Sequence, residues 1–124
     1  MLKKPRFVVH RHAASHLHYD FRLEAEGVLK SWAVPKGVPQ TPGVRRLAVA
    51  VPDHALDYID FTGVIPEGEY GAGEVEIWDK GSYEVESWKK DKIVFRLDGN
   101  KTKGSYALVH MKDRNWLFLK LKKD

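Results

Sequence analysis

Cysteine is absent from this 124-residue chain, and so is any long apolar run. The lack of cysteine excludes disulfides, thiolate zinc sites and cysteine nucleophiles, so a bound metal would depend on histidine and carboxylate ligands. No apolar stretch approaches the roughly 18 residues of a membrane-spanning helix, and the N-terminus lacks the apolar segment of a signal peptide. We therefore expect a cytoplasmic protein that makes no contact with membranes.

Helical periodicity is scarce as well, whereas apolar and polar residues alternate through most of the chain. Short alternating runs separated by Gly, Pro, Asp and Asn favour an antiparallel β-barrel or sandwich, and the length fits a single domain over 1–124. One short helix is expected, near Asp53 or Ser15. The segments predicted as strands are 6–12, 17–24, 28–34, 45–51, 74–79, 82–87, 92–98, 104–111 and 115–122.

The charge balance is mildly basic, with 21 Lys and Arg against 17 Asp and Glu. The resulting net charge of +4 favours an anionic partner only weakly. The glycine-rich segment 66–73 lacks the Lys-Ser or Lys-Thr ending of a phosphate-binding loop and does not lie between a strand and a helix. It is predicted to be a structural loop.

Histidines gather between positions 10 and 18, just before an alternating run. If residues 17–24 form a strand, His18, Asp20 and Arg22 project from one face and apolar residues from the other. The Cα atoms of His18 and Asp20 would then lie about 6–7 Å apart, which suits two ligands of one ion.

A third ligand would come from the preceding strand, where His10 and His12 share a face. Two imidazoles and a carboxylate suit Mn, Fe, Co or Zn, and Arg22 would point at an anion held by the metal. The competing interpretation is that this polar face is only the solvated face of an edge strand. The spacing leaves both interpretations open.

A second candidate cluster follows in the strand predicted at 45–51. Arg46 shares a face with the small residues Ala48 and Ala50, which would leave room for a ligand over that face. His54 follows in a turn, where it is either a surface residue or a proton donor or phosphate ligand. Lys36, in a predicted loop, would meet a phosphate or only water.

Taken together, these segments resemble the 3′-phosphoesterase family, which occurs as the N-terminal module of bacterial DNA ligase D and as a free-standing enzyme. The resemblance is carried by FVV with His12, by LHYDFRLE at 17–24 and by GVLKSWAVPKG at 27–37. It continues through RLAV at 46–49, Asp53-His54, Leu56-Asp57-Tyr58 and FTGVIPEGEYGAG at 61–73. These runs extend over nearly the whole chain.

The resemblance implies a mostly all-β, single-domain antiparallel barrel with a polar cavity on one side and little helix. It also implies a manganese-dependent enzyme, in which Co²⁺ or another divalent transition metal substitutes, that removes a 3′-terminal ribonucleoside. The same enzyme then hydrolyses the remaining 3′-phosphate to a 3′-hydroxyl. Its substrates would be DNA or RNA–DNA primer-template 3′ ends, and its partners a separate DNA ligase, a polymerase or Ku. We expect a monomer.

By motif, the resemblance implies metal ligation by His12, His18 and Asp20. The phosphate-binding and catalytic groups it implies are Arg22, Arg46 and His54, supported by Lys36 and Tyr58. Two positions depart from the family pattern: Pro52 stands where glutamate is usual, and His10 replaces a usual glutamine. His10 would add a metal ligand or a phosphate contact.

Two other classes of protein compete with this interpretation. A non-haem iron oxygenase would use His18 and Asp20 with a distant histidine, either His54 or His110. A single-strand nucleic-acid-binding barrel would use the same fold without catalysis. The surplus of basic residues favours a phosphate substrate over the oxygenase.

Overall fold

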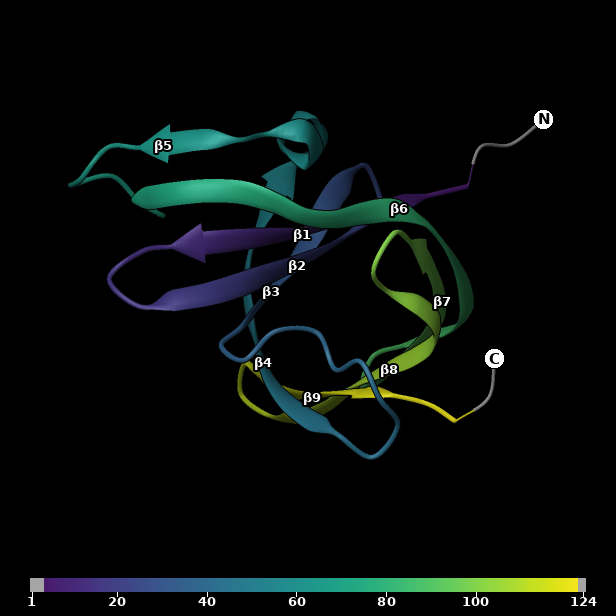
Figure 1. Ribbon diagram of the computed structural model, residues 1–124. Coiled ribbons are helices and arrows are strands. Elements are labelled where there is room, and N and C mark those ends of the chain that lie inside the picture. The colour runs from purple at the N-terminus through teal and green to yellow at the C-terminus, as the bar shows by residue number, and fades with distance from the viewer. Residues whose placement is uncertain (1–3, 123–124) are drawn as a thin grey trace.

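The structure, a computed structural model, describes residues 4–122, and almost all of this part of the chain is antiparallel sheet (Figure 1). One short 3₁₀ helix, η1 (Leu56–Asp60), interrupts the strands within these residues. The strands are β1 (Arg6–Ala13), β2 (Leu17–Ala25), β3 (Val28–Val34), β4 (Arg45–Ala55), β5 (Gly63–Ile65), β6 (Gly73–Lys89), β7 (Lys92–Gly99), β8 (Lys103–Lys112) and β9 (Asn115–Lys120).

The strands close into a barrel. Their order is β1-β2-β3-β4-β9-β8-β7-β6, and a pairing of β1 with β6 completes the ring. The short strand β5 pairs with the first residues of β6, outside the ring. Closure satisfies the backbone groups that an open edge would leave unpaired. The predicted antiparallel β-barrel with little helix is therefore confirmed.

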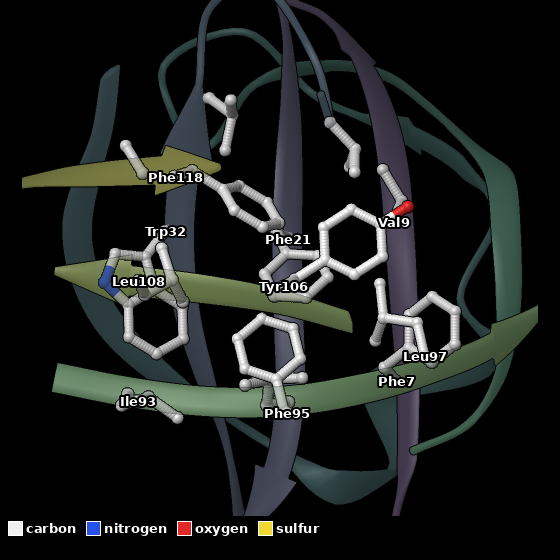
Figure 2. Packing of buried hydrophobic residues seen from close by; sticks show 14 of the residues in the cluster. Phe7, Val9, Phe21, Trp32, Ile93, Phe95, Leu97, Tyr106, Leu108 and Phe118 are labelled. Atoms are coloured by element: carbon white, nitrogen blue, oxygen red, sulfur yellow. The ribbon is translucent and has the colours of Figure 1, made fainter. Parts of the chain in front are cut away.

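The barrel interior is filled by aromatic and aliphatic side chains (Figure 2). Phe21 of β2 lies near the middle, with its ring centroid 4.8 Å from that of Phe118 and 5.8 Å from that of Phe95. Each such buried side chain contributes roughly 1.5–3 kcal/mol to folding. This core fixes which face of each strand points inward and which is left to form a site outside the barrel.

The strand β6 corrects one prediction. The predicted strands 74–79 and 82–87 leave a break between them, but β6 runs continuously through this segment. Gly81 is needed for packing, because a Cβ there would overlap the carbonyl of Asp98 on β7. Asp79 is buried and binds a turn that lies elsewhere in the chain. The strand β5 was not predicted at all, because its three residues carry too short an alternation to detect.

The helix η1 packs on the outer surface of the barrel. Ile59 lies against Val8 and Leu29 in a small second cluster, with Tyr58 at its margin. The helix lies close to the predicted position at Asp53, whereas Ser15 lies in a bend. This packing holds Tyr58 beside the polar face of β2. Within residues 4–122, no helix has the length and apolar character that crossing a membrane would require.

Candidate metal centre and cavity

The polar residues of the β1–β2 hairpin lie on the outer face of the barrel. Alternation along β2 sends Phe21 into the core and Asp20 and Arg22 outward. In the pairing of β1 with β2, His12 lies directly opposite His18, and His10 lies opposite Asp20. Neighbours across an antiparallel pair are only about 4.5–5.5 Å apart at Cβ. The register of one hairpin is therefore enough to assemble a cluster.

Three of these side chains form a group that could hold a metal ion. One potential ligand atom each from His12, His18 and Asp20 lies within 4.8 Å of the others. His12 Nδ1 is 3.2 Å from Asp20 Oδ2, and His18 Nε2 is 3.1 Å from Asp20 Oδ1. His12 and Asp20 are buried, and His18 is half-buried.

Whether the group fits a metal depends on what the nitrogen that faces away from Asp20 does in each ring. His12 Nε2–H donates to the carbonyl of Ala72 at 3.0 Å, and His18 Nδ1–H donates to the carbonyl of His16 at 3.2 Å. In the neutral form of each ring, these bonds leave a lone pair on the nitrogen that faces Asp20; in the protein without metal, a proton on that nitrogen can bond the carboxylate instead. Two lone pairs and a carboxylate at this distance need a cation among them, so the donor set fits a divalent metal ion.

The electrostatics of the group agree with that reading. The hydrogen bond to Asp20 raises the pKa of His18. Burial alone would raise the pKa of Asp20, but the hydrogen bond from His18 and the charge of Arg22 outweigh burial and lower it. Asp20 is thus held as a carboxylate in a nearly enclosed position, which is the form that binds a metal.

Arg22 lies beside the metal-binding group and is almost fully buried. Its Nε–H donates to His10 Nδ1 at 3.0 Å, and its Nη2–H donates to Asp20 Oδ2 at 3.3 Å. Its Nη1 donates to Ser31 Oγ at 2.9 Å and to His54 Nδ1 at 3.1 Å. The guanidinium is therefore fixed in direction before any ligand arrives.

His54 and Tyr58 complete this side of the site. The ring centroids of His54 and Tyr58 are 4.5 Å apart, and the Arg22 guanidinium carbon lies 5.0 Å from the centre of the Tyr58 ring. Burial and the neighbouring Arg22 charge lower the pKa of His54, so it is neutral at pH 7 in this arrangement. Burial raises the pKa of the Tyr58 hydroxyl.

A cavity of about 760 Å³ opens over these residues. His12, His18, Asp20, Arg22, His54 and Tyr58 all contribute to its lining. The rest of its lining includes the β1–β2 turn and the loop between β5 and β6, where Tyr70 has 74% of its surface exposed. The cavity is much larger than one phosphate group and leaves space for the remainder of a larger ligand.

The chain matches the DNA Ligase D 3′-phosphoesterase domain family over residues 10–110. It belongs to this family. Similar proteins include the multifunctional non-homologous end joining protein LigD of Pseudomonas aeruginosa, 49% identical over 94% of this chain. The protein of the same name in Mycolicibacterium smegmatis is 46% identical, and the non-homologous end joining DNA repair protein LigD of Mycobacterium tuberculosis is 47% identical. The chain spans only 15%, 17% and 16% of these three relatives, respectively.

The barrel brings six of the nine residues that the family resemblance singled out into the cavity and leaves three outside it. His10 is fully buried behind Arg22, so it does not reach the cavity surface. Lys36 is exposed in the turn after β3, and neither it nor Arg46 lines the cavity, although both lie within the described residues.

The prediction of room for a ligand over the face of Arg46, Ala48 and Ala50 is wrong. Ala48 is completely buried in the barrel core, and Ala50 packs against that core. Arg46 lies opposite Phe118 in the pairing of β4 with β9, on the same inward face. The small residues leave room for core aromatics, not for a ligand. His54 reaches the cavity because β4 continues beyond the predicted strand end to Ala55.

Two contributors to the candidate site were missed. Ser31 accepts a hydrogen bond from Arg22, and Tyr70 lines the cavity from the glycine-rich loop. The sequence does carry a signal for Ser31: Glu26-Gly27 separates two alternating runs, which favours a two-residue hairpin turn, and in the structure both residues have positive φ. That turn fixes the register that pairs Arg22 with Ser31. No local signal places the loop of Tyr70 over the hairpin.

Proposed function

We propose that this chain is a divalent-metal-dependent phosphoesterase that repairs the 3′ ends of DNA or of RNA–DNA primer-templates. It removes a 3′-terminal ribonucleoside and hydrolyses the remaining 3′-phosphate to a 3′-hydroxyl. The observation that carries the proposal is the joining, in one cavity, of a His-His-Asp group that fits a metal and a pre-oriented buried arginine. Membership of the 3′-phosphoesterase domain family supports the same reaction class.

The metal we propose is Mn²⁺, with Co²⁺ or another divalent transition metal as a substitute, since two imidazoles and one carboxylate suit these ions. His12, His18 and Asp20 would hold it through the atoms that face one another. A divalent ion there supplies Lewis-acid polarisation of a phosphoryl oxygen. The carbonyls of Ala72 and His16 orient the two rings for this purpose.

The protein's own charges then act on the phosphoryl group. Arg22 donates to four acceptors through its described contacts, and the one remaining Nη2–H has no partner within residues 4–122. We propose that this hydrogen, with the full guanidinium charge behind it, stabilises the negative charge that builds up in the transition state. His54 is the candidate for binding the phosphate or for protonating the leaving oxygen, and Tyr58 supports both through its ring contacts.

His10, Lys36 and Arg46 lie outside the cavity, and in this proposal none of them contacts the reacting phosphate. The partners we propose are a DNA ligase, a polymerase and Ku, because the relatives are named for non-homologous end joining. We propose that residues 1–124 act as one phosphoesterase domain, as a monomer in the cytoplasm.

The test is an assay on a 5′-labelled primer-template that ends in one ribonucleotide, run with and without Mn²⁺, beside an oligonucleotide that already carries a 3′-phosphate. The expected result is manganese-dependent conversion of both to a 3′-hydroxyl end. A primer with an all-deoxy end should react much more slowly at the first step. Binding of single strands without any conversion would instead identify a non-catalytic barrel, and oxygen consumption with Fe²⁺ that depends on the protein would identify an oxygenase.

A further inference from the structure

His10 lies one layer behind the cavity, between Arg22 and the carbonyl of Phe61. It has no exposed surface, in contrast to the half-buried His18. Arg22 Nε is 3.0 Å from His10 Nδ1, and His10 Nε2 is 3.1 Å from the Phe61 oxygen. Because a guanidinium only donates and a carbonyl only accepts, Nδ1 must be the acceptor and Nε2 must carry the proton. One tautomer, the neutral Nε2–H form, satisfies both neighbours.

The surroundings keep His10 in this form. A second proton, on Nδ1, would point at the Arg22 Nε–H and would have no acceptor in a fully buried position. The ring also meets Tyr58 edge-on, with centroids 5.3 Å apart. His10 therefore acts as a neutral ring that accepts from Arg22 through Nδ1 and donates to Phe61 through Nε2.

The contacts on both sides of His10 connect two parts of the site. Phe61 follows η1, and its N–H donates to the carbonyl of Tyr58 at 3.0 Å, which closes the end of that helix. The Phe61 and Tyr58 rings are stacked, 4.8 Å apart. His10 thus ties the guanidinium on β2 to the segment that presents Tyr58.

We propose that His10 is a positioning residue for Arg22. It holds Nε–H of the guanidinium, so that the plane of Arg22 and its one unpartnered N–H stay directed at the phosphoryl site. This inference rests on the proposed function. Without the acceptor, Nε–H would be a buried donor with no partner, which is unfavourable, and the guanidinium would turn toward another acceptor.

The first test needs no substitution. Nitrogen NMR of the histidine rings in the intact protein should show His10 as the Nε2–H tautomer, with Nδ1 unprotonated and accepting from Arg22. A His10 ring that carries its proton on Nδ1 could not accept from Arg22, and this result would overturn the proposal even if every variant failed to fold.

The second test compares three variants in the Mn²⁺-loaded protein. His10→Leu removes the acceptor, whereas His10→Gln keeps both an acceptor and a donor. His110→Leu is the matched control, because His110 also bonds a backbone carbonyl, that of Asp113, at 2.7 Å but does not contact Arg22. Binding of inorganic phosphate is measured by calorimetry, and Mn²⁺ affinity is measured separately on the same samples.

His10→Leu should weaken phosphate binding on the order of tenfold, the equivalent of one unsatisfied donor, with Mn²⁺ affinity little changed. His10→Gln should bind phosphate within about threefold of wild type, and His110→Leu should be unchanged. In an Arg22→Ala background, His10→Leu should have no further effect, because His10 acts through Arg22. An equal loss in that background, or undiminished binding in His10→Leu, would overturn the proposal. Because these readouts involve no turnover, a wild-type protein inactive on 3′-phosphate ends would refute the proposed function separately.

Discussion

Two buried carboxylates, Asp20 and Asp79, serve opposite purposes in the same barrel. Their exposed fractions are nearly equal, 6% and 3%. Asp20 faces two histidines and an arginine at the cavity. Asp79 accepts hydrogen bonds from the backbone N–H groups of Asn100 and Thr102, and from the Thr102 hydroxyl. Burial alone therefore does not identify a functional carboxylate; the kind of partner does.

The partners also explain what each carboxylate can do. The groups around Asp20 are cationic or can become so, and a metal ion can take the place of their protons. The groups around Asp79 are neutral donors that close the turn between β7 and β8, and no ion can replace them without opening the turn. A carboxylate whose partners are all backbone and hydroxyl donors contributes to stability, whereas one surrounded by imidazoles is available for chemistry.

The largest expected effect is that of Asp20→Asn. The amide keeps the shape of the carboxyl group but not its charge, so metal binding should fail. We expect 3′-phosphatase activity to fall by roughly 10³-fold or more, because several kcal/mol of charge stabilisation depend on the ion.

The melting temperature of wild type should rise on adding Mn²⁺, since a ligand at 100 times its Kd stabilises by about 2.7 kcal/mol. In Asp20→Asn this rise should vanish; a rise of normal size would remove Asp20 from the metal site.

Asp79→Ala should show the converse. It leaves the buried Thr102 N–H and hydroxyl without their acceptor, so the free energy of unfolding should fall by about 2–4 kcal/mol in a urea titration. The turnover of the folded fraction and the Mn²⁺-induced rise in melting temperature should both be retained. If activity fell as far as in Asp20→Asn at a temperature where the variant is folded, the division between the two carboxylates would be wrong.

The grouping of Asp20 with histidines could be predicted from the sequence. Alternation along 17–24 assigned His18 and Asp20 to one face, and the structure brings them together with His12. This succeeded because β2 has its apolar residues in strict alternation, so the core itself dictates the polar face. The barrel class followed for the same reason, from many short alternating runs.

The structural role of Asp79 could not be predicted, because the groups that it binds lie far from it in the chain. Asp-Lys-Gly at 79–81 has the composition of a turn, but the turn that Asp79 stabilises lies about twenty residues later. The same limit applies to Arg46: small neighbours can mean room for a ligand or room for a core aromatic, and only the pairing with β9 decides between them. The competing interpretation, in which this polar face is the solvated face of an edge strand, also fails, since β2 is paired on both sides and His12 and Asp20 are buried.

A smaller effect is expected for His54. Like Asp20 it contacts Arg22, but unlike Asp20 it carries no fixed charge, so its charge state should respond to a bound anion. Burial and Arg22 lower its pKa, so in the substrate-free protein the midpoint of its NMR titration should lie below the usual value of about 6.5. Inorganic phosphate should raise that midpoint, because a nearby dianion favours imidazolium.

The same shift bears on the pH–rate profile. If His54 acts as the acid, activity should fall as pH rises through its pKa in the substrate complex, and this alkaline limb should be missing in His54→Ala. An unchanged limb in His54→Ala would assign the proton to another group and leave His54 only a role in phosphate positioning. A midpoint that phosphate does not move would argue against any contact between His54 and the bound anion.

Tyr70 should give the smallest effect, and it extends the comparison to a residue with almost no burial. It lines the same cavity as Asp20 although 74% of its surface is exposed, so its removal costs little packing. A ring in that position can stack on a base, an interaction worth about 1–3 kcal/mol when fully formed and less at an open edge. Tyr70→Ala should therefore raise the KM for an oligonucleotide substrate by about three- to tenfold at unchanged kcat. Tyr70→Phe should be close to wild type because stacking needs the ring and not the hydroxyl.

Hydrolysis of a small phosphate monoester without a base should be unaffected in both variants. An equal loss on the small ester would mean that Tyr70 acts on the phosphate or the metal. Its role would then not differ from that of the residues around Asp20.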